Sequence, residues 1–222
     1  MLILALDTAT EAVAAAVLDT DADAVLGRAS FLGPASHGEQ LAPVVAQALA
    51  EASAQPGDLT GIGVGRGPGP FTGLRVGLVH AGVMGWALGI PVHGVCTLDV
   101  LAEQAHRQGI RGPFLVATDA RRREVYWARY GTDARRLEGP HVGPARDIPD
   151  RSVPAVGAGA AAYPDDLVDH REPLYPDPAV MARIAARMIS AGGPADLTPL
   201  YLRRPDAVAA SGRKKVTPDE RH

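Results

Sequence analysis

Cysteine, lysine and aromatic residues are all scarce in this chain of 222 residues. Its single cysteine, Cys96, excludes an internal disulfide and any metal cluster built from cysteines. Its only lysines are Lys214 and Lys215, near the end, so the body of the chain lacks the lysine that a P-loop requires. One cysteine is typical of a protein from a reducing compartment, and we expect this one in the cytoplasm.

An excess of basic residues is also missing. The sequence has 22 Lys and Arg against 25 Asp and Glu, which gives a formal net charge of −3. A protein that holds nucleic acid by itself usually carries a basic surface. If RNA is the substrate, we therefore expect another protein to hold it.

Long uninterrupted apolar runs are absent as well. In Val76–Val92 the only plainly polar residue is His80, but glycines interrupt this segment, Pro91 ends it, and it is shorter than a usual membrane-spanning helix. The first ten residues carry no basic region and reach an acidic residue at Asp7, which indicates a strand and not a secretory signal. We expect no membrane partner.

Hydrophobic periodicity predicts strands and helices in two successive sets. The first set has strands at 2–6, 13–18, 25–31, 62–65 and 92–96, and helices at 39–52, 72–88 and 97–108. The second set has strands at 114–118, 124–130 and 155–156, a proline-rich and weakly patterned stretch from Pro140 to Pro178, and a helix with Asp177 as N-cap, Pro178 at its first position and Gly192 just past its end. The repeat predicts an α/β protein with two related lobes, 1–99 and 100–203, and a disordered tail at 204–222. We leave open whether the last helix packs back on the first lobe.

A glycine-rich stretch, Gly61–Gly73, lies between an expected strand and an expected helix. Free backbone N–H groups at such a junction often bind phosphate. This stretch has neither the P-loop lysine nor the G-x-G-x-x-G spacing of dinucleotide-binding proteins. Its glycines also permit a tight turn and close backbone packing, and we favour that interpretation.

The helix expected at Thr72–Leu88 is apolar on nearly every side, with Arg75 and His80 as its clearly polar residues. Small residues recur every fourth position, at Gly73, Gly77, Ala81, Gly85 and Gly89. Such a stripe lets another helix approach closely. A helix that is apolar on all sides is usually buried on all sides. Either the chain's own lobe or a second polypeptide could cover this helix, and we leave both possibilities open.

Side chains that could carry catalysis are few. Asp7 and Asp119 each close an expected strand, where we expect them to cap turns. Ser36 precedes a helix and is more typical of a helix cap than of a nucleophile. No two histidines stand four residues apart, the spacing of a helical metal site. The run Arg121–Arg123 is able to contact phosphate, but a solvated turn is at least as good an interpretation.

Several segments occur in the order and spacing of one known family. They are Asp7–Glu11, Ser36-His37, Gly65–Arg75, Gly89–Val95, Asp119–Tyr126 and Pro199–Arg203. On these segments the chain resembles the TsaB (YeaZ) family, and the glycine-rich Gly65–Arg75 is the most specific of them. The resemblance spans nearly the whole chain, from Leu2 to Arg203.

The resemblance implies the two-lobed fold of actin, sugar kinases and the Hsp70 ATPase, in which each lobe is a mixed sheet with flanking helices. It also implies a subunit without catalytic, cofactor-binding or metal-binding residues, which binds and activates a TsaD-like catalytic paralogue and works with a TsaE-like ATPase. Together these proteins transfer a threonylcarbamoyl group to the adenosine beside the tRNA anticodon. This chain would then meet tRNA only indirectly, through the complex, and would form a homodimer when isolated.

Two departures from catalytic relatives agree with such a subunit. The catalytic paralogue carries a metal-binding histidine pair near the helix that here starts at Thr97, whereas this helix offers only His106. Kinase-like relatives have a glycine in the first strand turn, which here reads Asp7-Thr-Ala-Thr10. An ATP-dependent small-molecule kinase of the same fold is the main alternative, and a hydrolase that uses Asp7 or Ser36 is a second.

In the family, two helices of the first lobe, here about Glu39–Ala52 and Thr72–Leu88, form the dimer face. The resemblance therefore implies a partner interface made by Leu41, Val45, Leu49, Thr72, Gly73, Val76, Gly77, His80, Ala81 and Met84. We place Gly77 and Ala81 at a helix–helix contact between chains. On this hypothesis a bulky residue at position 77 abolishes association and leaves the monomer folded.

Overall fold

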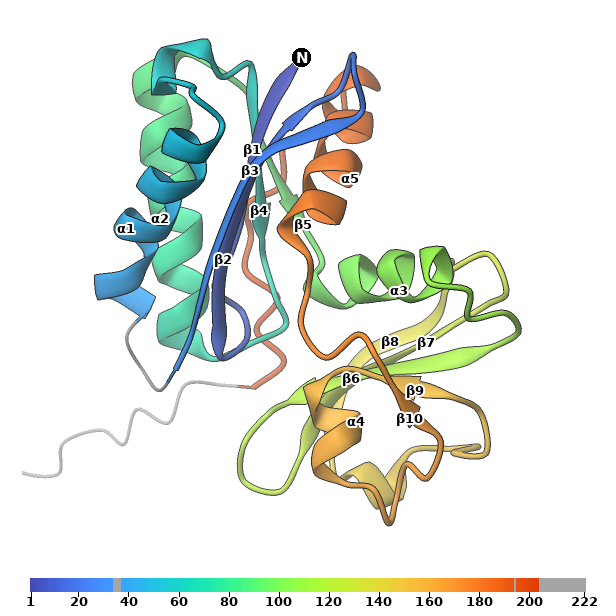
Figure 1. Cartoon of the computed structure of the whole chain (residues 1–222). Coiled ribbons are helices and arrows are strands. Elements are labelled where there is room, and N and C mark those ends of the chain that lie inside the picture. Colours follow the sequence, from blue (N-terminus) through green and yellow to red (C-terminus); the bar gives the residue numbers. More distant parts are fainter. Residues whose placement is uncertain (34–36, 194, 204–222) are drawn as a thin grey trace, which may run out of the picture.

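The computed structural model describes residues 1–33, 37–193 and 195–203, which form two lobes, each built on one five-stranded mixed sheet (Figure 1). This confirms the predicted two-lobed α/β fold. The expected tail at 204–222 and Ser36 lie outside the described residues. Within the described part of the chain, no helix has both the length and the apolar character that crossing a membrane demands.

The sheet of the first lobe has the strand order β3-β2-β1-β4-β5. Its strands are β1 (Leu2–Asp7), β2 (Ala12–Asp19), β3 (Ala24–Leu32), β4 (Gly61–Gly65) and β5 (Val92–Val95). The first three form an antiparallel meander, and β4 and β5 run parallel to β1. Because parallel strands need crossover connections, a helix follows β4 before the chain returns as β5.

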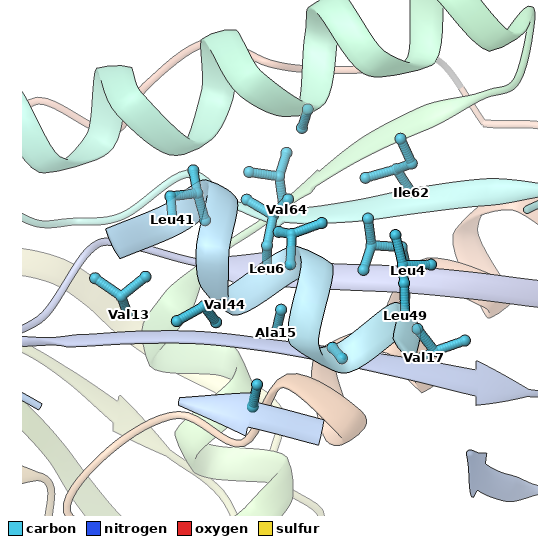
Figure 2. Packing of buried hydrophobic residues seen from close by; sticks show 14 of the residues in the cluster. Leu4, Leu6, Val13, Ala15, Val17, Leu41, Val44, Leu49, Ile62 and Val64 are labelled. Atoms are coloured by element: carbon cyan, nitrogen blue, oxygen red, sulfur yellow. The ribbon is translucent and has the colours of Figure 1, made fainter. Parts of the chain in front are cut away.

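Helices cover both faces of this sheet (Figure 1). On one face lie α1 (His37–Glu51) and α2 (Phe71–Leu88), and on the other lies α5 (Pro178–Ser190). Along β1 the side chains alternate, so that Leu4 and Leu6 face α1 and α2 while Ile3 and Ala5 face α5. Figure 2 shows the first of these cores, in which Leu4 and Leu6 lie among apolar side chains of β2, β4 and α1.

The second lobe repeats this arrangement with the strand order β10-β9-β6-β7-β8. Its elements are α3 (Thr97–Arg107), β6 (Phe114–Asp119), β7 (Val125–Tyr130), β8 (Arg136–Gly143), β9 (Ala155–Val156), α4 (Ala158–Ala162) and β10 (His170–Arg171), with short 3₁₀ turns at Pro56–Asp58 and Ala145–Asp147 in the two lobes. Alternation along β6 sends Phe114 and Val116 toward α3, and Leu115 and Ala117 toward α4.

Most expected elements are present, and the misses fall in the second lobe. The N-cap of α5 is confirmed, because the Asp177 carboxylate accepts the Ala179 N–H at 2.8 Å. Strands β8 and β10 and helix α4 are not predicted by the sequence, and all three overlap the weakly patterned stretch from Pro140 to Pro178. Strand β8 is a largely polar edge strand that contains Pro140, a composition that argues against a strand when it is read alone.

Candidate partner interface

The small-residue stripe of α2 faces the chain's own sheet. Gly73, Gly77, Ala81 and Gly85 are all buried there. A Cβ atom at Gly77 would lie under 3.0 Å from the Thr8 hydroxyl, and one at Gly73 would meet the Thr8 carbonyl equally closely. The Thr8 hydroxyl donates to the Gly73 carbonyl at 2.7 Å, which joins α2 to the turn directly after β1. Our placement of Gly77 and Ala81 between chains is therefore wrong: the stripe admits β1, not a partner helix.

The opposite side of α2 is apolar and exposed to solvent. Val79, Val83 and Trp86 expose 62%, 60% and 85% of their surface, and they recur at the spacing of one helical face. Isolated exposed apolar residues are ordinary, but a contiguous row of large ones is typical of an interaction site. The chain's own sheet therefore covers one side of α2, and covering of the other side by a second polypeptide stays a prediction.

A groove of about 700 Å³ runs between α1 and α2 beside this row. Its walls are Ala42, Val45, Ala46, Leu49, Pro56, Val76, Val79, His80, Val83, Met84, Ala87 and Leu88. The only titratable group among them is His80, and burial holds the pKa of its imidazole below the usual value, which favours the neutral form. A solvent-exposed groove whose walls carry no charged group is suited to burying an apolar surface of a partner protein.

The predicted interface residues fall into three groups. Val76, His80 and Met84 line the groove and Thr72 is exposed near the start of α2. Val45 and Leu49 are buried in the lobe core and form part of the groove's floor. The others are covered by the chain itself, which removes them from any contact with a partner: Leu41, Gly73, Gly77 and Ala81.

The exposed row Val79, Val83 and Trp86 was absent from the predicted interface. The sequence held a signal for it, since these residues lie across the helix from the glycines. If the small stripe packs on the sheet, the large apolar side chains opposite must point outward.

The best-placed carboxylate between the lobes, Asp7, is fully buried. One of its oxygens accepts the Ala9 N–H at 2.7 Å, and the other accepts the Thr97 hydroxyl at 2.8 Å. Asp7 therefore caps the turn after β1, as expected, and joins it to the start of α3. Burial raises the pKa of its carboxyl to about 6, because the charged form loses its hydration.

This pKa predicts that Asp7→Asn stabilises the fold at neutral pH. Between pH 3.8 and about 6 the folded chain keeps a proton that the unfolded chain has lost, so stability falls as the pH rises through this window. The whole difference corresponds to about 3 kcal/mol. An asparagine keeps the acceptor for Ala9 without the charge, and urea unfolding should show its advantage over wild type growing by about 1.4 kcal/mol from pH 5 to pH 8. An asparagine variant that is less stable than wild type at pH 8 would contradict this account.

The other residues considered for catalysis or ligand binding also serve to hold the backbone in place. Asp119 accepts the Arg121 N–H at 2.9 Å and caps the turn after β6. A Cβ atom at Gly69 would meet the Ala9 backbone at under 3.0 Å, so the glycine-rich stretch packs closely on the β1 turn, as we favoured. In the described part of the chain, no three His, Cys, Asp or Glu side chains gather as a metal site would need.

Comparison with known proteins decides the family. Residues 34–158 match the family described as "TsaD: tRNA N6-adenosine threonylcarbamoyltransferase". TsaB of Escherichia coli, named a tRNA threonylcarbamoyladenosine biosynthesis protein, is 40% identical over 135 residues, 60% of this chain and 56% of that protein. A crystal structure from Pseudomonas aeruginosa, of a protein "with similarity to peptidase YEAZ", is 30% identical, has a TM-score of 0.78 and matches 91% of this chain and 99% of its own. The chain belongs to the TsaB (YeaZ) family.

Membership of the TsaB family confirms the resemblance drawn from the six sequence segments. The match to the P. aeruginosa structure extends over both lobes, so the fold is shared along nearly the whole chain. An uncharacterized protein of Mycobacterium bovis, Mb3455c, is 47% identical over 208 residues, 92% of this chain and 93% of its own length. The similarity to this relative therefore runs along nearly the whole of both chains.

Proposed function

We propose that this chain is a partner subunit in the biosynthesis of tRNA threonylcarbamoyladenosine, and that it binds and activates a TsaD-like threonylcarbamoyl transferase through the groove between α1 and α2. The observation that carries the proposal is the uncharged groove together with the exposed row Val79, Val83 and Trp86. Similarity to proteins named for this pathway supports the same role.

We also propose that the chain has no reaction centre of its own. Asp7 is buried, and both of its carboxylate oxygens accept hydrogen bonds from the chain itself, so it is poorly placed to contact a substrate. Asp119 is likewise engaged with the Arg121 backbone. On this proposal the catalytic groups belong to the TsaD-like paralogue, and this chain supplies the surface that holds it in its active form.

The remaining partners follow from the same proposal. A TsaE-like ATPase joins the complex, tRNA is held mainly by the other subunits, and the site of action is the cytoplasm. The net charge of −3 supports a secondary place for this chain in RNA binding. When no TsaD-like partner is present, a second copy of the chain covers the α1–α2 groove, because the exposed apolar row favours burial.

Light scattering after size-exclusion chromatography tests this proposal. The purified chain alone should elute with the mass of a homodimer. Addition of one equivalent of the TsaD-like paralogue from the same organism should convert it to a one-to-one complex, and threonylcarbamoyl transfer to tRNA should require both proteins. Separate elution of the two proteins after mixing, with no peak at the mass of a complex, or full transfer by the paralogue alone, would refute the proposal.

A further inference from the structure

Three consecutive arginines form an unusual turn between β6 and β7. Arg121, Arg122 and Arg123 have φ angles of 56°, 55° and 61°, in the left-handed region that residues other than glycine seldom adopt. Asp119 caps the turn, and the Glu124 N–H donates to the Arg121 carbonyl at 3.0 Å. The turn thus holds three exposed guanidinium side chains on a fixed backbone, and strained backbone of this kind gathers at functional sites.

This turn forms one wall of a cavity of about 330 Å³ between the lobes. The opposite wall is the start of α2 at Pro70 and Phe71, and the C-terminal segment at Tyr201 closes the cavity. Among the residues that the structure describes, no acidic side chain lines it. Arg203, another lining residue, is neutralised by an ion pair with Glu124. Within the described residues neither Arg121 nor Arg123 has an ion pair with a carboxylate; Arg121 lines this cavity, whereas Arg123 lines a second hollow on the other side of the turn, together with Glu124 and Asp166.

Aromatic rings and a further arginine extend the wall at α2. The Arg75 guanidinium lies 3.7 Å from the centre of the Phe71 ring, and the Phe71 and Tyr201 rings are 4.9 Å apart. Arg75 also donates to the Tyr201 hydroxyl at 3.2 Å, which fixes the group. Guanidinium groups interleaved with flat rings are the composition that proteins use for RNA, with charges for phosphates and rings for bases.

The cavity lies next to the proposed partner groove. Phe71 lines the cavity and Val76 lines the groove, and both are on α2. Five residues of helix correspond to about 7.5 Å along its axis. A partner protein that holds RNA beside the groove would therefore bring it close to these arginines.

We propose that the Arg121–Arg123 turn binds backbone phosphates of tRNA within the complex with the TsaD-like partner. This inference rests on the proposed function. Because the whole chain is acidic, binding by the isolated chain is weak, and the turn adds its contacts to those of the partner. Its role is to orient tRNA on the assembled complex.

The test is the double variant Arg121→Gln/Arg123→Gln in the assembled complex, titrated with an unmodified substrate tRNA over a range of salt concentrations. Loss of two phosphate contacts should lower the affinity at 100 mM salt at least about fivefold and reduce the slope of log K against log salt by about 1.4 to 1.8. A matched control, Arg135→Gln/Arg187→Gln, removes two exposed arginines, one from the turn between β7 and β8 and one from α5, and should bind tRNA as wild type does.

Each outcome separates this inference from the proposed function. Unchanged affinity and slope in an assembled variant complex would overturn the inference, as would an equal loss in the control. A loss of ATP binding or of TsaE-like ATPase binding in place of tRNA binding would overturn it too. If wild type forms no complex with the TsaD-like partner, the proposed function fails. In that case the arginine turn is tested on the isolated chain at low salt. If the double variant binds tRNA there as tightly as wild type does, the inference fails as well.

Discussion

Val83→Asp should lower the affinity for the TsaD-like partner by at least about 100-fold and leave the chain folded. The Val83 side chain is 60% exposed on the outer face of α2, so the folded chain loses little by the change. In the complex the new carboxylate would be buried in a groove with no charged group to pair with, and such burial costs several kcal/mol. A 100-fold loss corresponds to about 2.7 kcal/mol. Isothermal titration calorimetry measures it.

Val168→Asp provides the matched control. Val168 is 76% exposed, and it lies in the second lobe between α4 and β10, away from the groove. The chemical change and the net charge are the same, so its affinity for the partner should stay within about twofold of wild type. Equal losses in the two variants would show that added negative charge, and not the position on α2, weakens the complex.

Gly77→Leu should destabilise the monomer by about 3 kcal/mol, the upper part of the usual range for overpacking. Even a Cβ atom at this position would overlap the Thr8 hydroxyl and approach Leu6, so α2 must move off β1. The hydrogen bond from Thr8 to the Gly73 carbonyl, which is buried, is lost with it. For a chain of this size the melting temperature should fall by roughly 6 to 12 °C, which thermal unfolding monitored by circular dichroism detects.

Gly82→Leu is the control on the same helix. Gly82 is partly exposed, and a Cβ atom there would meet only Leu197, at an ordinary 3.9 Å. Leucine is a better helix former than glycine by roughly 0.8 kcal/mol, so this variant should be as stable as wild type or more so. A folded, stable Gly77→Leu chain that fails to bind the partner would restore the placement that the structure overturns.

The sequence was sufficient for the strands of the first sheet and for the helices that cover it, because the apolar period of each is regular. It was sufficient for Asp177 as a helix cap because the cap depends on adjacent residues. The sequence did not reveal which face of α2 packs on the chain's own sheet. A glycine stripe shows that some neighbour comes close, but strand β1 and a partner helix demand the same small side chains, and the choice depends on contacts with Thr8, 65 to 69 residues away in sequence.

The environment of Asp7 shows the same limit. Its place at the end of a strand predicts the turn cap on Ala9, which is local. Its complete burial and raised pKa arise from remote segments, since Thr97 hydrogen-bonds to it and a Cβ atom at Gly65 would overlap its carboxylate. Short-range patterns do not encode such long-range contacts. The edge strand β8 was missed for a related reason, because its partner β7 compensates for a composition that disfavours a strand.

The central claim, that a TsaD-like protein covers the outer face of α2, can be measured at Trp86. The chain has two tryptophans, Trp86 at 85% exposure and Trp127 at 7%. With 5-fluorotryptophan in this chain alone, fluorine NMR gives one resonance for each, and Trp86→Phe assigns them. On addition of the unlabelled partner, the Trp86 resonance should shift and lose its sensitivity to H₂O–D₂O exchange, while Trp127 changes little. A fully formed complex in which Trp86 stays as exposed to solvent as in the free chain would contradict the account.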